Sequence, residues 1–154
     1  MSYTKKQIDS YDYDEDYFQP IVELYLLSLN HYKKYFNSLD FNISPPQWHA
    51  LNRLWKEDGL TQAELAKKIF RDYTFITRLL DDLEKKGFVQ RNIDPADRRV
   101  NRIFLTKKSK DFKYKAYPYF LDRAEKLRNG LTDEDLETLR KLCKRLINNY
   151  SHFK

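Results

Sequence analysis

Two stretches of this chain place hydroxyl and guanidinium groups where they could bind a polyanion. The first, TFITRLLDDLEK at residues 74–85, carries two threonines and an arginine on one side of a predicted helix. The second, DPADRR at residues 94–99, is turn-rich and ends in two adjacent arginines. Such groups on the first turns of an exposed helix suit the phosphates and base edges of a DNA major groove. An arginine at a turn suits the minor groove, whose negative potential is strongest over narrow A·T-rich stretches.

These considerations define an expected DNA-binding surface. We expect Thr74, Thr77 and Arg78 to face bases or nearby phosphates, and Tyr73 could stack on a sugar or touch a thymine methyl group. The alternative for this helix is a purely structural element with a polar outer side. The complete expected surface is Thr61, Gln62, Arg71, Tyr73, Thr74, Thr77, Arg78, Asp97, Arg98 and Arg99.

The acidic member of this surface has a separate expected role. A carboxylate beside phosphates is repelled, so we expect Asp97 to orient an arginine, either Arg78 or a neighbour in the same turn, rather than to touch DNA. For the pair Arg98 and Arg99, the alternative is an ordinary solvated turn.

Two short amphipathic helices must position the first stretch. Thr61 and Glu64 have the spacing of a capping box, which predicts a helix start. Asp72 is a good N-cap for the second helix, and Gly87 after two lysines is a conventional stop. The apolar positions of the two helices are Leu65, Ala66 and Ile69, then Ile76, Leu79, Leu80 and Leu83.

A hairpin must position the second stretch. Residues 88–91 and 102–105 alternate well enough to be strands, with a turn-rich loop at 92–99. Helix, turn, helix and hairpin in this order make a winged helix-turn-helix. The expected fold class is mainly α, an α+β winged helix with a two-stranded wing, flanked by N- and C-terminal helices that form a dimerisation lobe.

Flanking helices are expected on both sides of the winged helix. An apolar and aromatic pattern predicts a helix from about Asp16 to Leu39, and a loop from Phe41 leads into a helix capped by Ser44. After the hairpin, Thr106 should cap a helix over residues 107–129, which Pro118 should bend or interrupt. The last helix is expected to begin within residues 131–135. The apolar stripes of these flanks include Trp48, Leu51, Leu54 and Trp55, and later Leu136, Leu139, Leu142, Cys143, Leu146 and Ile147.

We expect a single domain over residues 16–154, after a flexible acidic tail at 1–15. Within it, residues 45–106 form the DNA-binding lobe, and residues 16–44 and 107–154 supply dimerisation helices. Their apolar surface exceeds what one small lobe needs, so it should be buried against another subunit.

The charge distribution favours a polyanionic partner. The formal net charge is +6; residues 61–110 hold 13 Lys and Arg against 7 Asp and Glu, and the rest of the chain holds 16 of each. All excess positive charge therefore lies in the segment expected to meet DNA. A single cysteine excludes an internal disulfide and a multi-thiolate zinc site, and no apolar run reaches membrane-spanning length. We expect a cytoplasmic protein that needs no cofactor, no metal and no membrane.

The motifs also resemble a known family, the MarR-type transcriptional regulators. The order and spacing of that family are found in three motifs, LTQAELA, TRLLDDLEKKGFVQR and DPADRR, the last followed by a strand and LT. The resemblance covers roughly Tyr17 to Tyr150. DPADRR is its most specific part. One departure is Phe70-Arg71, where relatives usually have a glycine and a small or aliphatic residue before the recognition helix.

The resemblance implies a dimeric repressor on a roughly palindromic operator, with Arg99 as the better candidate for minor-groove insertion. It also implies an effector crevice near His31, Tyr35, Trp48 and His49 for a small aromatic or phenolic molecule. Ordinary packing between lobes is the alternative explanation for these four residues. The third histidine, His152, is too distant in sequence to suggest a metal site with the others.

Two other classes of function compete with this interpretation. A winged helix can serve as a protein-interaction module whose basic surface meets an acidic partner. A redox switch could act through Cys143, but relatives that sense peroxides use a cysteine near the first helix, and an apolar stripe favours a buried, inert thiol. No arrangement of Ser, His and Asp places a nucleophile beside a base, so we expect no enzyme.

Overall fold

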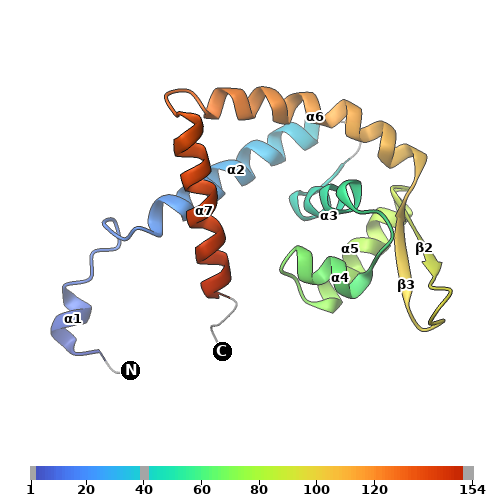
Figure 1. Cartoon of the computed structure of the whole chain (residues 1–154), viewed down its shortest axis with the longest axis horizontal. Helices are drawn as coiled ribbons and strands as arrows, with labels where there is room; N and C mark the ends of the chain where they lie inside the picture. The colour runs from blue at the N-terminus through green and yellow to red at the C-terminus, as the bar shows by residue number, and fades with distance from the viewer. Residues whose placement is uncertain (1–2, 39–41, 151–154) are drawn as a thin grey trace. The chain divides into compact units, whose positions relative to one another are not determined.

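The computed structural model describes residues 3–38 and 42–150 (Figure 1). Its elements are α1 (Lys5–Asp9), α2 (Gln19–Ser38), α3 (Pro45–Lys56), β1 (Leu60–Thr61), α4 (Gln62–Lys68), α5 (Tyr73–Lys85), β2 (Val89–Ile93), β3 (Asn101–Leu105), α6 (Lys107–Leu127) and α7 (Asp133–Tyr150). The predicted fold class, mainly α with a small antiparallel sheet, is confirmed over these residues. Leu39, Phe41 and His152 lie outside the described residues. The chain divides into two compact units, Met1–Thr106 and Lys107–Lys154, which are described separately.

Side-chain caps start α3, α4 and α5 where the sequence places them. The Thr61 hydroxyl accepts a hydrogen bond from the Glu64 amide at 3.2 Å, while the Glu64 carboxylate accepts one from the Thr61 amide at 2.8 Å. Ser44 and Gln47 form the same reciprocal pair at the start of α3. Asp72 accepts from the Phe75 amide at 2.8 Å and begins α5. Each cap satisfies backbone donors that the first turn of a helix leaves free.

The core of this unit lies where α3, α4 and α5 meet the sheet. Its fully buried side chains come from every one of these elements, and removal of this apolar surface from water is the main stabilising term. They include Leu51, Leu54, Leu65, Ile76, Leu80, Leu83, Phe88 and Ile103. Most of the apolar stripes predicted for α3, α4 and α5 are buried, whereas Trp55 and Ile69 are only half-buried.

The sheet contains one strand that the sequence pattern did not indicate. Strands β2 and β3 form the predicted hairpin, in register from Val89 opposite Leu105 to Ile93 opposite Asn101. The added strand β1 pairs with the other edge of β3, with Leu60 opposite Ile103, giving the order β1-β3-β2. Two residues are too short for an alternating pattern to be recognisable.

A glycine before β1 allows this pairing. Gly59 has a φ of +77°, and a Cβ there would lie 2.9 Å from a ring carbon of Phe104. Its amide donates to the Ile103 carbonyl at 3.0 Å. Only a residue without a side chain can combine that backbone conformation with so close an approach.

The second unit has two long helices. Pro118 was expected to bend or interrupt α6. The helix continues through Pro118, so it is not interrupted there. Helix α7 starts as expected, because Thr132 and Asp135 cap it reciprocally. None of its residues is buried, and Leu139, Leu142 and Ile147 are about half exposed. Cys143 is half-buried in the single chain, so the expected complete burial of its thiol is not observed there.

The N-terminal tail is partly helical. We expected residues 1–15 to be frayed, but α1 begins with a capping box between Thr4 and Gln7. Among the described helices, none is long and apolar enough to cross a bilayer.

Candidate DNA-binding interface and its adjoining cavity

Helix α5 presents one face to the core and another to solvent. Its buried residues pack toward α3, α4 and β2. On the opposite face Thr74 and Arg78 are exposed, and Tyr73 is 61% exposed at the start of the helix. The hydroxyl, phenol and guanidinium groups of these three residues are thus exposed on one face of α5.

Two residues of the expected surface, Gln62 and Thr77, are hydrogen-bonded to each other. Gln62 is only 8% exposed, and its side-chain amide donates to the Thr77 hydroxyl at 2.5 Å. That hydroxyl in turn donates to the Tyr73 carbonyl at 3.0 Å. Gln62 is therefore largely buried, with its side-chain amide directed at Thr77 on α5.

One arginine ties the hairpin to the outer side of α5. The Arg91 guanidinium, on β2, bonds to Glu84 at 2.5 Å, to Asp81 at 2.7 Å and to the Thr77 carbonyl at 3.3 Å. The Arg91 backbone amide also donates to Glu84 at 3.1 Å. Its side chain is 19% exposed, so this network is partly shielded from water and stronger than a surface pair. Sequence reasoning missed this role, because its partners lie in a different element.

The base of the wing is fixed by a buried carboxylate. Asp94 bonds to the Arg102 guanidinium at 2.6 Å and accepts from the Ala96 amide at 2.7 Å. The Ala96 amide, followed by Arg102, holds the pKa of Asp94 below its usual value. Arg102 also donates to the Gly59 carbonyl at 3.0 Å. The wing strand is thereby joined to the segment before α4.

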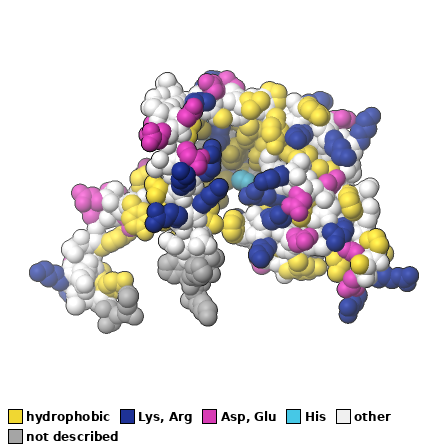
Figure 2. Space-filling model, in the orientation of Figure 1, with side chains coloured by type: hydrophobic (Ala, Val, Ile, Leu, Met, Phe, Trp, Pro, Cys, Tyr) yellow, Lys and Arg dark blue, Asp and Glu magenta, His cyan; other side chains and the backbone are white. Residues whose placement is uncertain are grey.

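The tip of the wing carries both expected arginines on its surface. Arg98 is exposed, and the Arg99 side chain is 90% exposed while its Nε lies 3.2 Å from Asp97. The Arg99 amide also donates to Asp97 at 3.0 Å, and this bond is the main reason that the pKa of Asp97 is lowered. Of the two partners predicted for Asp97, the wing neighbour is the one observed. Figure 2 shows Lys and Arg side chains projecting where Figure 1 places this end of the hairpin.

The turn between α4 and α5 has an unusual residue at its centre. Helix α4 ends with bonds from the Arg71 amide to Ala66 and from the Phe70 amide to Lys67, which together form a Schellman motif. Phe70 occupies the left-handed position at a φ of +55°. The same motif ends α5, where Gly87 takes that position at +74°. A side chain in this conformation costs about 1–2 kcal/mol that glycine avoids.

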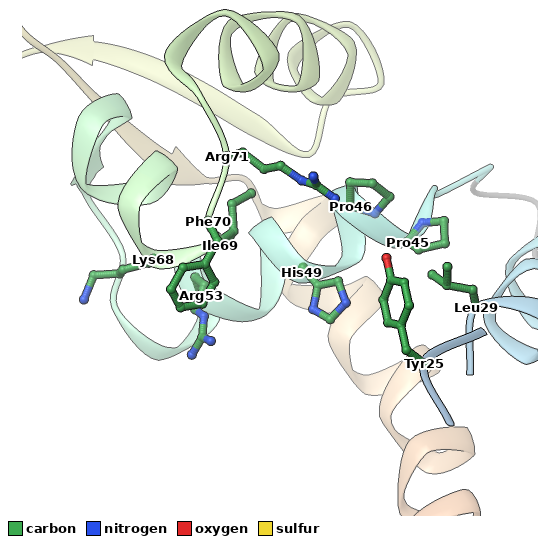
Figure 3. Close-up of a pocket in the computed structure, with 10 residues that line it drawn as sticks. All are labelled: Tyr25, Leu29, Pro45, Pro46, His49, Arg53, Lys68, Ile69, Phe70 and Arg71. Carbon is green, nitrogen blue, oxygen red and sulfur yellow. The ribbon is translucent and has the colours of Figure 1, made fainter. Parts of the chain in front are cut away.

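The same turn forms one wall of a cavity of about 280 Å³ (Figure 3). The other walls come from α2 and α3. The lining residues are Tyr25, Leu29, Pro45, Pro46, His49, Arg53, Lys68, Ile69, Phe70 and Arg71. In the close-up, Lys68 extends away from the cavity, in keeping with its ion pair to Glu57 at 2.8 Å. The cavity therefore combines apolar walls with the cations Arg53 and Arg71.

Only one residue of the predicted effector crevice lines this cavity. His49 does so, whereas Trp48 is buried and packs on Phe36 at 5.3 Å between ring centroids. Tyr35 also packs on Phe36, at 5.6 Å, and His31 is exposed on α2. Trp48, Tyr35 and His31 therefore do not line this cavity. Helical residues adjacent in sequence point to different sides, and only the packing of α2 on α3 decides which side is hollow.

The imidazole in the cavity is electrostatically disfavoured as a cation. Burial, followed by repulsion from the Arg53 and Arg71 guanidinium groups, lowers the pKa of His49. The imidazole also forms a T-shaped contact with the Tyr32 ring, with ring centroids 6.4 Å apart. Near neutral pH the cavity thus holds a neutral imidazole between two permanent cations.

Comparison with known proteins places this architecture in a family. The model of the MarR family matches residues 43–100. An uncharacterized HTH-type transcriptional regulator of Bacillus subtilis, YybA, is 30% identical over 114 residues, which cover 71% of this chain and 73% of YybA. The chain belongs to the MarR family. A shorter match to the regulator TtmR of Methylorubrum extorquens, 41% identical over 70 residues, spans 46% of this chain and 36% of TtmR.

Solved structures show the same MarR fold. FabT of Streptococcus pneumoniae, crystallised in complex with DNA, is 22% identical with a TM-score of 0.77, covering 93% of this chain and 100% of FabT. MepR of S. aureus, in its DNA complex, is 23% identical with a TM-score of 0.79, covering 90% of this chain and 99% of MepR. At these identities the likeness establishes the fold of this MarR-family chain.

The strain at Phe70 in this MarR-family protein yields a stability prediction. Phe70→Gly should raise the free energy of unfolding by up to about 1 kcal/mol, because relief of the left-handed conformation outweighs the added freedom of the unfolded chain. Little packing is lost, since Phe70 is 71% exposed. Urea unfolding followed by circular dichroism measures the change. A decrease of similar size would show that the ring stabilises the fold more than its backbone strains it.

The lowered pKa of His49 predicts a pH dependence. The unfolded chain, with a histidine pKa of about 6.5, binds a proton more readily than the folded one, so stability falls as the pH drops through the folded pKa. His49→Gln should flatten this loss between about pH 7 and pH 5. Unfolding curves of both proteins across that range provide the measurement. Parallel curves would mean that another group carries the dependence.

Proposed function

We propose that this protein acts as a homodimeric repressor that binds a roughly palindromic operator and releases it in response to a small aromatic anion. Membership of the MarR family makes it a DNA-binding transcriptional regulator. The dimer, the repression of transcription, the palindromic operator and the effector are our proposals beyond family membership. The observation that carries the proposal is the pairing of an exposed helix face with an arginine-tipped wing held by Arg91.

Each subunit would use α5 and the wing for different parts of the site. Thr74, Arg78 and Tyr73 are the residues that we assign to the major groove, where hydroxyl and guanidinium groups meet phosphates and base edges. Arg99 is assigned to the minor groove beside it. Two subunits would place their α5 helices in successive major grooves, about 34–36 Å apart. FabT and MepR were both solved with DNA, which supports duplex DNA as the partner of this relative.

Selection from a random duplex library tests this assignment. We expect a palindromic consensus, with log affinity falling steeply against log salt as for roughly 6–10 phosphate contacts. Arg99→Ala should weaken binding to the selected duplex and make that slope shallower by about one unit. Fluorescence anisotropy at several salt concentrations measures both quantities.

A matched variant separates the wing contact from general charge. Lys126→Ala removes one positive charge from α6, where Lys126 pairs with Asp122 at 2.8 Å, and should leave the slope unchanged. Absence of any enriched sequence, together with weak binding that Arg99→Ala does not alter, would refute the regulator. The protein-interaction module would then be the better interpretation.

Unburied apolar surface supports the dimer. Leu139, Leu142 and Ile147 on α7 are each about half exposed, as are Leu24 and Leu27 on α2. Complete burial of a leucine side chain contributes roughly 2 kcal/mol, so a second copy that covers these faces would be held firmly. Burial at such an interface would also remove Cys143 from oxidants, which argues against the redox switch.

Disruption of the α7 stripe tests the dimer. Leu142→Glu would place a carboxylate from each subunit in an apolar interface, and we expect it to give monomers in sedimentation velocity at micromolar protein. Lys141→Glu, its neighbour on the exposed side of the helix, should remain dimeric. If wild type itself sediments as a monomer, the proposed dimer fails.

The cavity supports an effector that is both aromatic and anionic. Its apolar walls suit a ring, and Arg53 and Arg71 suit a carboxylate or phenolate. A bound anion would also offset the repulsion that lowers the pKa of His49. This chemistry agrees with the small aromatic or phenolic effector that the family resemblance implies.

A further inference from the structure

The connection between α4 and α5 is at once a wall of the cavity and the entry to the helix that faces DNA. Lys68, Ile69, Phe70 and Arg71 all line the cavity, and Asp72, the next residue, is the N-cap of α5. Arg71, the last residue of this wall, is the direct neighbour of that N-cap, so a contact with the end of the wall acts next to the first turn of α5. No other described element has both positions.

Phe70 carries two costs that folding alone does not explain. It holds a left-handed backbone in the Schellman motif where α5 uses glycine, and its ring is 71% exposed at the cavity. Glycine would remove both costs. Strain that persists at a ligand-sized cavity points to a role for the side chain in what occupies that cavity.

Arg71 connects the cavity to α5 through its guanidinium. That group lies 5.2 Å from the centroid of the Phe75 ring, on the first turn of α5, while the same side chain lines the cavity and extends toward Pro46 (Figure 3). A cation held by a ring face exchanges readily for a charge-assisted hydrogen bond, which is the stronger interaction. An anion in the cavity would compete with Phe75 for Arg71.

We propose that Phe70 and Arg71 are the switch through which an aromatic anion in the cavity weakens DNA binding. The ligand ring packs on Phe70, and its anionic group withdraws the Arg71 guanidinium from Phe75. The strained turn then relaxes and the first turn of α5, with Tyr73 and Thr74, changes position. This inference rests on the effector cavity and the operator binding proposed above. It assigns their coupling to a turn that departs from the usual family pattern.

A tethered ligand tests the switch without knowledge of the natural effector. In a Cys143→Ser background, Leu29→Cys introduces a thiol on the α2 wall of the cavity, away from the turn. Its thiolate attacks dithiobis(nitrobenzoate), forming a mixed disulfide and releasing one thionitrobenzoate. The attached group is an aromatic carboxylate, and dithiothreitol removes it again.

The expected result is a loss of affinity that depends on Phe70. Labelling should weaken binding to the selected duplex by roughly 5- to 100-fold, the usual range of allosteric coupling, and reduction should restore it. With Phe70→Gly added, the ratio of labelled to unlabelled affinity should fall below about twofold. Amide hydrogen exchange in the first turn of α5 should increase on labelling only when Phe70 is present.

A second left-handed residue supplies the control. Asn42, at a φ of +45°, lies before α3 and does not line the cavity. Asn42→Gly also places glycine at a left-handed position, one that asparagine tolerates better than phenylalanine does, so it should keep the full effect of the label. If Asn42→Gly abolishes the effect as Phe70→Gly does, general relaxation of the lobe explains the response and the switch is refuted.

The remaining outcomes distinguish failure of the switch from failure of the proposed DNA-binding function. Unchanged affinity on labelling, or an equal loss with and without Phe70, overturns the switch and leaves the DNA-binding function intact. Failure of the unlabelled protein to select any duplex overturns the proposed function itself. Each variant is compared with its own unlabelled and reduced forms, so altered basal affinity does not affect the conclusion.

Discussion

The bonds made by Arg91 hold together the two elements that would read DNA. Helix α5 and the wing come from segments separated by the turn at Gly87, and each alone is a short element with one exposed face. Arg91 reaches from β2 to Asp81, Glu84 and the Thr77 carbonyl, so the helix and the strand keep one relative orientation. Binding of a duplex then orders little of the protein, and the entropy cost of association is correspondingly smaller.

Two aspartates of the wing each hold an arginine in position. Asp94 fixes the base of the wing through Arg102, and Asp97 holds Arg99 at its tip. In both cases the carboxylate accepts a hydrogen bond from a backbone amide as well as from an arginine, so it stays ionised and holds that cation in position. In the proposed complex Arg99 would exchange Asp97 for the minor groove, and the 90% exposure of its side chain would make that exchange inexpensive.

Local sequence signals predicted most of this fold because their physical causes are local. The caps at Thr61, Asp72 and Ser44 involve residues three positions apart, and the buried stripe of α5 follows helical periodicity. The misses involve partners far apart in the chain. The pairing of β1 with β3 and the burial of Gln62 against Thr77 depend on how the elements pack, which periodicity does not encode.

The same difference between local and long-range determinants explains which candidate sites could be predicted. The exposed arginines of the wing could be placed because a turn keeps them on the surface, whereas the cavity draws on three separate segments and shares only His49 with the predicted crevice. Phe70 and Arg71 stood out in the sequence as a departure from related proteins. Their consequence, a strained cavity wall, required the backbone angles.

The hairpin has a base and a tip that are determined independently. Pairing to β1, the Asp94–Arg102 contact and the bond from the Asp94 amide to the Val100 carbonyl at 2.8 Å fix its base, while residues 95–99 project beyond those ties. The Arg98 and Arg99 side chains take no part in those base contacts, so substitution of either would leave the fold intact. A duplicated gene could acquire a new operator through its wing while its core sequence remained almost the same.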